Sequence, residues 1–400
     1  RSFSCFHEHC GDWTSKRFLE WAESEGAPKA IPGLRDELLA ATMADTLSKI
    51  TPTPMFPDEA AKVIEEVNDR ELGRIERSTW FERFAYLQDD DSYFDMQDRR
   101  EIARSTFNAL YRHIPCKSIH DNKRRVEASV SFDENRQKLG ARALVGVTYA
   151  AGEDVQVARD GLPYGNRWKN ARPPVQAGDI SLWLNHLERM IPEQFEREHV
   201  LNVLAYKLQH PSKKINHAIL HAGKPGSGKD SLYTPFLWGI GGDQLVNVSI
   251  VRNEELTSSW GYALESEVMV INELRQAEAK DRRALENNLK PLIAAPPELL
   301  SVNRKGLHPY MALNRLLVLA YSNERAAISL PSDDRRWFVL WSDADRMKEE
   351  DSVRLWRWYK SGGMAAVCEY LYARDVSAFN PGCVPPMTEA KQVLIGLGMS

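Results

Sequence analysis

The sequence predicts an α/β fold built on a parallel sheet, and three observations indicate it. Short apolar runs, typical of buried strands, alternate with helical segments from residue 215 onward. A glycine-rich loop follows the first of these runs and precedes a helix-like stretch. Polar residues end the later runs, and parallel sheets bind ligands at the carboxyl ends of their strands. We therefore expect a five-stranded parallel sheet flanked by helices.

The elements of this core can be placed in order along the chain. Four strands are expected in INHAIL (215–220), EVMVIN (267–272), NRLLVLAYSN (314–323) and RRWFVLW (335–341). The stretch SLYTPFLWGI (231–240) should be the helix after the glycine-rich loop. Upstream, 178–211 predicts two helices that separate near Pro192, and the last sixty residues should be mostly helical.

We divide the chain into four parts. They are 1–57, a cysteine- and histidine-bearing segment with a proline-rich linker; 58–177, an N-terminal α+β module; 178–345, the α/β core; and 346–400, a helical C-terminal segment. Within the second part, 80–87 should contain a strand and 98–114 should form an amphipathic helix.

Composition limits the classes of function. The chain has 400 residues, 43% hydrophobic and 27% charged, as expected of a globular protein with real cores. No apolar run approaches the roughly 18 residues of a membrane span, so no membrane contact is expected. The net charge is −4, so nucleic-acid binding would need local basic patches. Five scattered cysteines argue against a disulfide framework and predict a reducing, cytoplasmic location.

The glycine-rich loop nearly matches the phosphate-binding pattern G-x-x-x-x-G-K-[ST], with Asp230 where Ser or Thr is usual. Such a loop offers backbone N–H groups to phosphate oxygens, and Lys229 would reach the β- and γ-phosphates of ATP. The alternative is a surface loop that happens to contain glycine and lysine. The predicted nucleotide-binding residues are Gly223, Gly226, Ser227, Gly228, Lys229, Asp230 and Ser231.

Asp230 and Asn272 are predicted to serve the Mg²⁺ that accompanies ATP. Asn272 stands at a strand end where a carboxylate is usual, so Asp230 would supply the carboxylate that this strand lacks. Ser231 is a poor substitute, because one residue along a helix rotates the side chain by about 100°. The alternative for Asp230 is a carboxylate that only favours the helix dipole.

Four residues are predicted to be catalytic. Glu273 would be the general base that activates water, and Asn323 would orient that water. Arg335 or Arg336 would act as an arginine finger on the nucleotide of a neighbouring subunit. The alternatives are an exposed strand-end carboxylate, a turn-capping asparagine, and a solvated ion-pair cluster of the two arginines with the two preceding aspartates.

Five motifs follow one another in a recognisable order: GKPGSGKD, VMVINE, LKPLIAAPPELLSVNRKGLHPY, RLLVLAYSN and DDRRWFVLW. This order resembles the helicase part of phage and prophage primase–helicases, which belong to helicase superfamily 3 of the AAA+ class. The likeness covers about 178–341. It implies an ATPase and DNA helicase that forms a hexameric ring in a bacterial host cell, with ATP between subunits and a primase–polymerase domain upstream. Asn272 departs from the general superfamily pattern.

The resemblance also implies a hairpin or loop that projects into the ring and grips single-stranded or forked DNA. It would be SVNRKGLHPY, with Arg304, Lys305 and His308 as its basic residues. The alternative is an ordinary basic surface turn. Lys290, in NNLKPL, would support this element or lie near the nucleotide.

The first ten residues contain Cys5, His7, His9 and Cys10, which are suitable zinc ligands. No second ligand cluster downstream completes the site. The segment resembles the second half of the family's zinc motif, and we expect a solvated tail rather than a bound Zn²⁺.

These residues are compatible with three functions. The first is an ATP-driven DNA helicase or translocase. The second is an ATP-switched DNA-binding module that assembles on an origin without unwinding it. The third is a kinase with a phosphate-binding loop, but no segment resembles the lid that a kinase would need.

Overall fold

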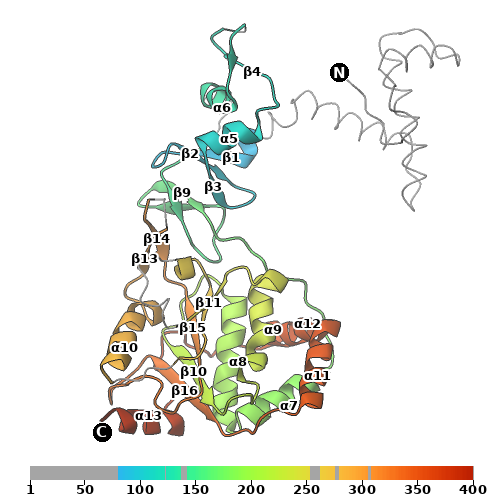
Figure 1. Cartoon of the computed structure of the whole chain (residues 1–400), viewed down its shortest axis with the longest axis vertical. Coiled ribbons are helices and arrows are strands. Elements are labelled where there is room, and N and C mark those ends of the chain that lie inside the picture. Colours follow the sequence, from blue (N-terminus) through green and yellow to red (C-terminus); the bar gives the residue numbers. More distant parts are fainter. Residues whose placement is uncertain are drawn as a thin grey trace, which may run out of the picture. The chain divides into compact units, whose positions relative to one another are not determined.

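The computed structural model describes residues 80–121, 123–136, 142–252, 262–274, 279–304 and 308–399. The chain divides into two compact units, which we describe separately (Figure 1). Of the described residues, the smaller unit contains 80–82 and 111–135, and the larger unit contains 83–110 and those from 136 onward. The predicted segment 1–57 lies outside the described residues, and so does the beginning of the predicted module 58–177.

A parallel sheet of five strands forms the centre of the larger unit, as predicted. The strands are β10 (Ala218–Gly223), β11 (Val248–Val251), β12 (Val268–Ile271), β15 (Leu317–Ser322) and β16 (Trp337–Ser342). They lie in the order β11-β12-β15-β10-β16, and every neighbouring pair is parallel. All carboxyl ends therefore meet at one edge of the sheet, where the glycine-rich loop leaves β10.

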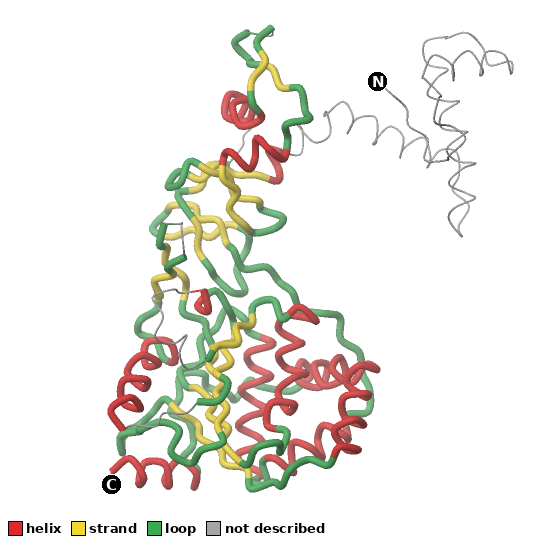
Figure 2. The backbone as a smooth tube through the Cα atoms, in the orientation of Figure 1, coloured by secondary structure: helices red, strands yellow, loops and turns green. Residues whose placement is uncertain are grey.

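Helices cover both faces of this sheet (Figure 2). One face packs against α7 (Ser181–Met190), α8 (Gln194–Gln209), α9 (Lys229–Gly241), α11 (Glu349–Trp358) and α12 (Met364–Ala373). The other face packs against α10 (Ala279–Ile293) and α13 (Glu389–Met399). Successive strand residues point to opposite faces, so Ile219 joins the first core and Leu220 the second. Burial on both faces explains the continuous apolar runs of the sequence.

The larger unit also carries two small sheets that precede α7. One has the order β3-β2-β1-β6, from β1 (Phe84–Leu87), β2 (Ser92–Asp95), β3 (Arg100–Ala103) and β6 (Ala143–Leu144). The other has the order β7-β9-β8, from β7 (Val147–Thr148), β8 (Gln156–Arg159) and β9 (Leu162–Asn166).

Two secondary-structure predictions in this region are partly wrong. The helix expected over 98–114 is strand β3 followed by the short helix α5 (Arg104–Leu110), because β3 pairs antiparallel with β2. The strand expected in 80–87 begins only at Phe84, and residues 80–83 are helical. In both cases pairing with β2 decides where the strand lies.

The smaller unit is a short hairpin with one helix. Strand β4 (Cys116–Lys117) pairs antiparallel with β5 (Arg125–Val126), and α6 (Ala128–Arg136) follows. Phe132 of α6 stacks on Phe81, with ring centroids 5.0 Å apart. In the part of the chain that the structure describes, no helix is both long and apolar enough to cross a membrane.

Candidate functional site

The glycine-rich loop connects the end of β10 to the start of α9 and needs glycine at several positions. Gly226 and Gly228 have φ values of 72° and 96°, in the left-handed region that favours glycine. A Cβ on Gly223 would lie 2.5 Å from the carbonyl oxygen of Ser342 in β16. The glycines are therefore required by backbone conformation and by close packing against β16.

The carbonyl oxygens of the last three loop residues all accept hydrogen bonds from outside the loop. The pairs are the Met347 N–H with Gly226 O at 3.0 Å, the Arg189 guanidinium with Ser227 O, and His186 Nε2 with Gly228 O at 2.9 Å. In a trans peptide the C=O and the following N–H point in opposite directions. The N–H groups of Ser227, Gly228 and Lys229 consequently face the other side of the loop.

These three N–H groups are suited to receive an anion. Within the described residues, none of them has an internal hydrogen-bond acceptor. The N-terminus of α9 lies at the same place and adds the favourable end of a helix dipole. The arrangement suits a phosphate group chemically, and the residues Gly226 to Lys229 provide it.

Helix α7 holds this loop through two residues that sequence reasoning missed. His186 and Arg189 lie three positions apart, on one face of the helix. His186 is buried, and burial lowers its pKa to about 4, so it is neutral at pH 7. Its Nε2 also lies 3.1 Å from the hydroxyl of Ser231. The only sequence signal for this role is the spacing of the two residues in LNHLER.

Lys229 and Asn323, both predicted site residues, are in direct contact. The Lys229 ammonium donates to Asn323 Oδ1 at 3.0 Å and to the carbonyl oxygens of Gly223 and Lys224 at 2.8 Å each. Lys229 is only 7% exposed, and burial lowers its pKa. Asn323 directly follows β15, the strand beside β10. The carboxyl edge of the sheet therefore brings the loop and the predicted motif RLLVLAYSN together.

The other predicted ATP-site residues lie at the same edge. Asp230 is exposed in the first turn of α9. Ser231 is buried, and its hydroxyl donates a hydrogen bond to Gly228 O at 2.8 Å. Asn272 and Glu273 are exposed just after β12. Their turn is tied to the end of β15, because the Leu274 N–H donates to the Tyr321 carbonyl at 2.7 Å.

Arg335 and Arg336 directly precede β16. They therefore lie where the strands begin, opposite to the carboxyl edge that carries the loop. Trp337, the first residue of β16, pairs with Ala218, while Ser342 pairs with Gly223. The five residue steps between these pairs span about 17 Å of strand. The alternative for these arginines is a solvated ion-pair cluster with the two preceding aspartates; of these, Asp334 is buried and its carboxylate pairs with Lys391 at 2.9 Å.

The predicted DNA-binding segment is the connection of an antiparallel hairpin, β13 (Leu299–Val302) and β14 (Tyr310–Leu313). The Arg304 guanidinium lies 3.2 Å from Glu101 and 3.8 Å from Glu265. His308 is exposed and lies 3.4 Å from Asp90. Lys305 is outside the described residues.

Lys290 forms an ion pair with Glu286 at 2.7 Å, one turn earlier on α10. The possible zinc ligands Cys5, His7, His9 and Cys10 fall outside the described residues. In the ranges that the structure describes, no group of three or more His, Cys, Asp or Glu side chains could hold a metal ion.

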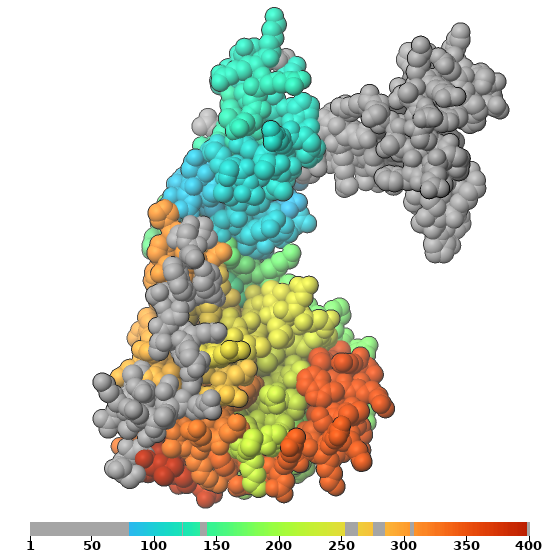
Figure 3. Space-filling model, viewed as in Figure 1, coloured from blue at the N-terminus to red at the C-terminus, as the bar shows by residue number. Residues whose placement is uncertain are grey.

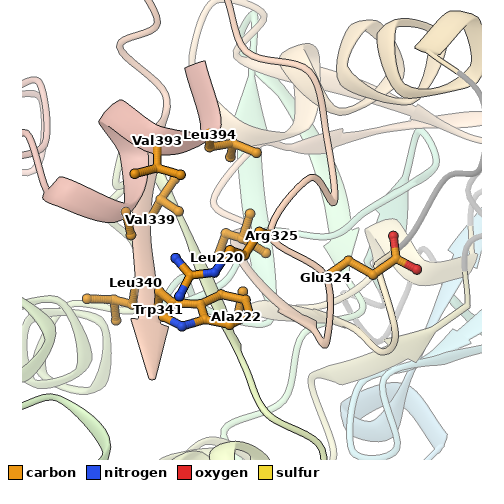
Figure 4. Close-up of a pocket in the computed structure, with 10 residues that line it drawn as sticks. Leu220, Ala222, Glu324, Arg325, Val339, Leu340, Trp341, Val393 and Leu394 are labelled. Atoms are coloured by element: carbon orange, nitrogen blue, oxygen red, sulfur yellow. The ribbon is translucent and has the colours of Figure 1, made fainter. Parts of the chain in front are cut away.

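A small pocket lies on the α13 side of the sheet and is distinct from the loop (Figure 4). The Arg325 guanidinium stacks on the Trp341 ring there, 4.1 Å from its centroid. The rest of the lining is mainly apolar, from β10, β16 and α13. None of the loop residues 224–228 lines it, so it is separate from the candidate phosphate site.

Of the comparisons with known proteins, the similarity to solved structures agrees with this mixed α/β architecture with a parallel sheet. Residues 221–336 match the model of a family described as "Family of unknown function (DUF5906)". No curated protein matches the chain. An apo structure of the C-terminal region of NrS-1 is similar at 19% identity with a TM-score of 0.62, covering 79% of this chain and 72% of that one. The A-form apo structure of the same region is similar at 19% identity with a TM-score of 0.61, and it has the same coverage of both chains. At this identity the likeness concerns the fold.

Proposed function

We propose that this chain is an ATP-dependent, ring-forming DNA helicase or translocase of the AAA+ class. The observation that carries the proposal is the contact between Lys229 and Asn323 beside three loop N–H groups that face away from the engaged loop carbonyls. In this proposal the ammonium and the N–H groups bind phosphate and the amide orients water, at the carboxyl edge where parallel sheets bind nucleotides.

The residues present fit ATP with Mg²⁺. The N–H groups of the loop and the Lys229 ammonium would hold the phosphates, because the loop carbonyls are turned away and engaged elsewhere. Asp230 and Asn272 are exposed oxygen donors at the same edge, as a hard cation requires. Bound Mg²⁺ would neutralise charge that develops on the phosphates. Glu273 would accept the proton of the attacking water, and Asn323 would orient that water.

Assembly into a ring explains the position of the paired arginines. Arg335 and Arg336 are about 17 Å of strand away from the loop of their own chain. In a closed ring with head-to-tail contacts, that edge of one subunit can approach the nucleotide of the next. A guanidinium there would stabilise the charge of phosphoryl transfer.

The DNA contact is assigned to the connection between β13 and β14, which carries Lys305. Arg304 is engaged by Glu101 and Glu265, and His308 lies 3.4 Å from Asp90, so Lys305 is the proposed DNA contact on its position in the sequence. A basic tip suits a phosphate backbone without base readout. The motif order, which resembles phage primase–helicases, supports DNA as the substrate.

Two assays separate this function from its alternatives. DNA-stimulated ATP hydrolysis is expected of a helicase and of an origin-assembly switch, but not of a small-molecule kinase. Strand displacement on a forked DNA is expected only of the helicase. ATP-dependent DNA binding without displacement would replace the proposal with the switch.

A further inference from the structure

The smaller unit carries a concentration of positive charge in a chain whose net charge is −4. Between residues 111 and 126 there are five Lys or Arg side chains and a single acidic residue, Asp121. All five cations are exposed: Arg112, Lys117, Lys123, Arg124 and Arg125. Most of them lie on the hairpin β4–β5, which extends past helix α6 (Figures 1 and 3). We call these five residues the basic hairpin.

The register of the hairpin places two cations directly opposite each other. Lys117 pairs with Arg125, and the adjacent pair is Cys116 with Val126. Cys116 is buried and Val126 half-buried, so Lys117 and Arg125 share the solvent face. Like charges at directly opposed positions destabilise a strand pair. The arrangement opposes folding stability, and binding of a polyanion would relieve the repulsion.

Among the described residues, neighbouring carboxylates form no ion pair with the basic hairpin. Asp121 is used in the turn, where its Oδ1 accepts the Lys123 N–H at 2.9 Å. Glu134 accepts the Ile119 N–H at 2.9 Å and the Ser118 hydroxyl at 2.9 Å. Donation by the Ile119 N–H is the main cause of the lowered pKa of Glu134, with Arg124 contributing. Within the described residues, none of the five cations has a carboxylate at ion-pair distance.

We infer that the basic hairpin is a second nucleic-acid contact, which binds the phosphate backbone of single-stranded DNA independently of base sequence. Exposed, unpaired Lys and Arg side chains release counterions from a nucleic acid when they bind it, and this supplies sequence-independent affinity. The choice of nucleic acid over another polyanion, such as an anionic membrane, rests on the proposed function. The contact itself lies outside the ATP site.

The test compares the full chain with the double variant Lys117→Gln, Arg125→Gln on a fluorescent oligothymidylate. Loss of two phosphate contacts should raise Kd about 25-fold near 0.1 M salt and reduce the slope of log K against log salt by about 1.4. The melting temperature should stay equal or rise, because the opposed charges are gone. Mg²⁺-ATP binding should be unchanged, which separates this inference from the nucleotide site.

The matched control is Arg357→Gln, Lys360→Gln, which removes the same charge from exposed positions on α11 and the turn after it. The DNA Kd of this control should stay within about twofold of the Kd of the unsubstituted chain, if the charge that matters is that of the hairpin. Equal weakening by both double variants, or an unchanged DNA affinity in the hairpin variant, would overturn the inference. Binding to vesicles that contain phosphatidylserine is measured in parallel. Loss of vesicle binding with intact DNA binding in the hairpin variant would also overturn the inference.

Discussion

The ammonium of Lys229 lies 3.0 Å from Oδ1 of Asn323, although 94 residues separate them in the chain. The contact exists because β10 and β15 are neighbouring parallel strands that end together. Lys229 begins the helix after one strand and Asn323 follows the other. Two residues that are predicted separately from their motifs thus meet in one candidate site.

Replacement of Asn323 by Ala should lower the kcat for ATP hydrolysis by about 10- to 100-fold while KM changes little. The amide is expected to orient water in the reaction rather than to hold the nucleotide. Steady-state ATPase kinetics with Mg²⁺ would measure both constants. A raised KM with an unchanged kcat would instead assign Asn323 to nucleotide binding.

The position of the metal carboxylate can be tested with Asp230→Ser, Asn272→Asp and the double variant. Each single variant changes the number of carboxylates at the carboxyl edge of the sheet. The double variant restores the original number, with the carboxylate now at position 272, just after β12. Asp230→Ser should raise the Mg²⁺ concentration for half-maximal ATPase about tenfold. The double variant should recover part of this loss. A double variant that performs worse than both single variants would contradict an exchange of roles between Asp230 and Asn272.

His186 should act on nucleotide affinity through the loop that it holds. His186→Leu removes the donor to Gly228 O, and the Kd for ATP should rise about tenfold. His186→Gln, whose amide can donate, should recover most of the affinity. His199→Leu is the control, because His199 is buried against His217 and does not contact the loop. Equal losses in the Leu and Gln variants would show that shape, not the hydrogen bond, matters.

Folding stability should fall in mild acid because several histidines are buried in neutral form. Burial lowers the pKa of His199 to about 4, and those of His217 and His221 to about 3, from an ordinary value of 6.5. Below pH 6.5 the unfolded chain binds protons that the folded chain does not. The free energy of unfolding should therefore decrease as pH falls from 6.5 towards 4.

Urea unfolding at several pH values would measure this dependence. The variant His199→Gln, His217→Gln removes one buried pair and should show a shallower loss in the same pH range. An identical pH dependence in the variant and the parent chain would assign the acid sensitivity to other groups.

Much of the central sheet could be predicted because four of its strands are continuous apolar runs. β11 could not be located, since Val248–Val251 is an edge strand with a half-exposed pattern and an exposed Ile250. The residues of β3 fit a helical period, so the sequence predicts a helix there, and only pairing with β2 makes this segment a strand.

Part of the candidate site could also be predicted, because motif residues sit at strand ends and parallel strands end at one edge. The roles of His186 and Arg189 could not, since they depend on how α7 packs against the loop. The contact of Arg304 with Glu101 joins residues 203 positions apart, so no local pattern indicates it. Such contacts become visible only in the folded chain.

The most direct test of the account is the rate of ATP hydrolysis by the wild-type chain and by Lys229→Ala, with Mg²⁺ and with or without forked DNA. Lys224→Ala is the matched control, because Lys224 is exposed and pairs with Asp345. We predict Mg²⁺-dependent hydrolysis that DNA stimulates, lost at least about 100-fold in Lys229→Ala and retained in Lys224→Ala. Absence of hydrolysis in the wild-type chain, or equal rates in Lys229→Ala, would contradict the account.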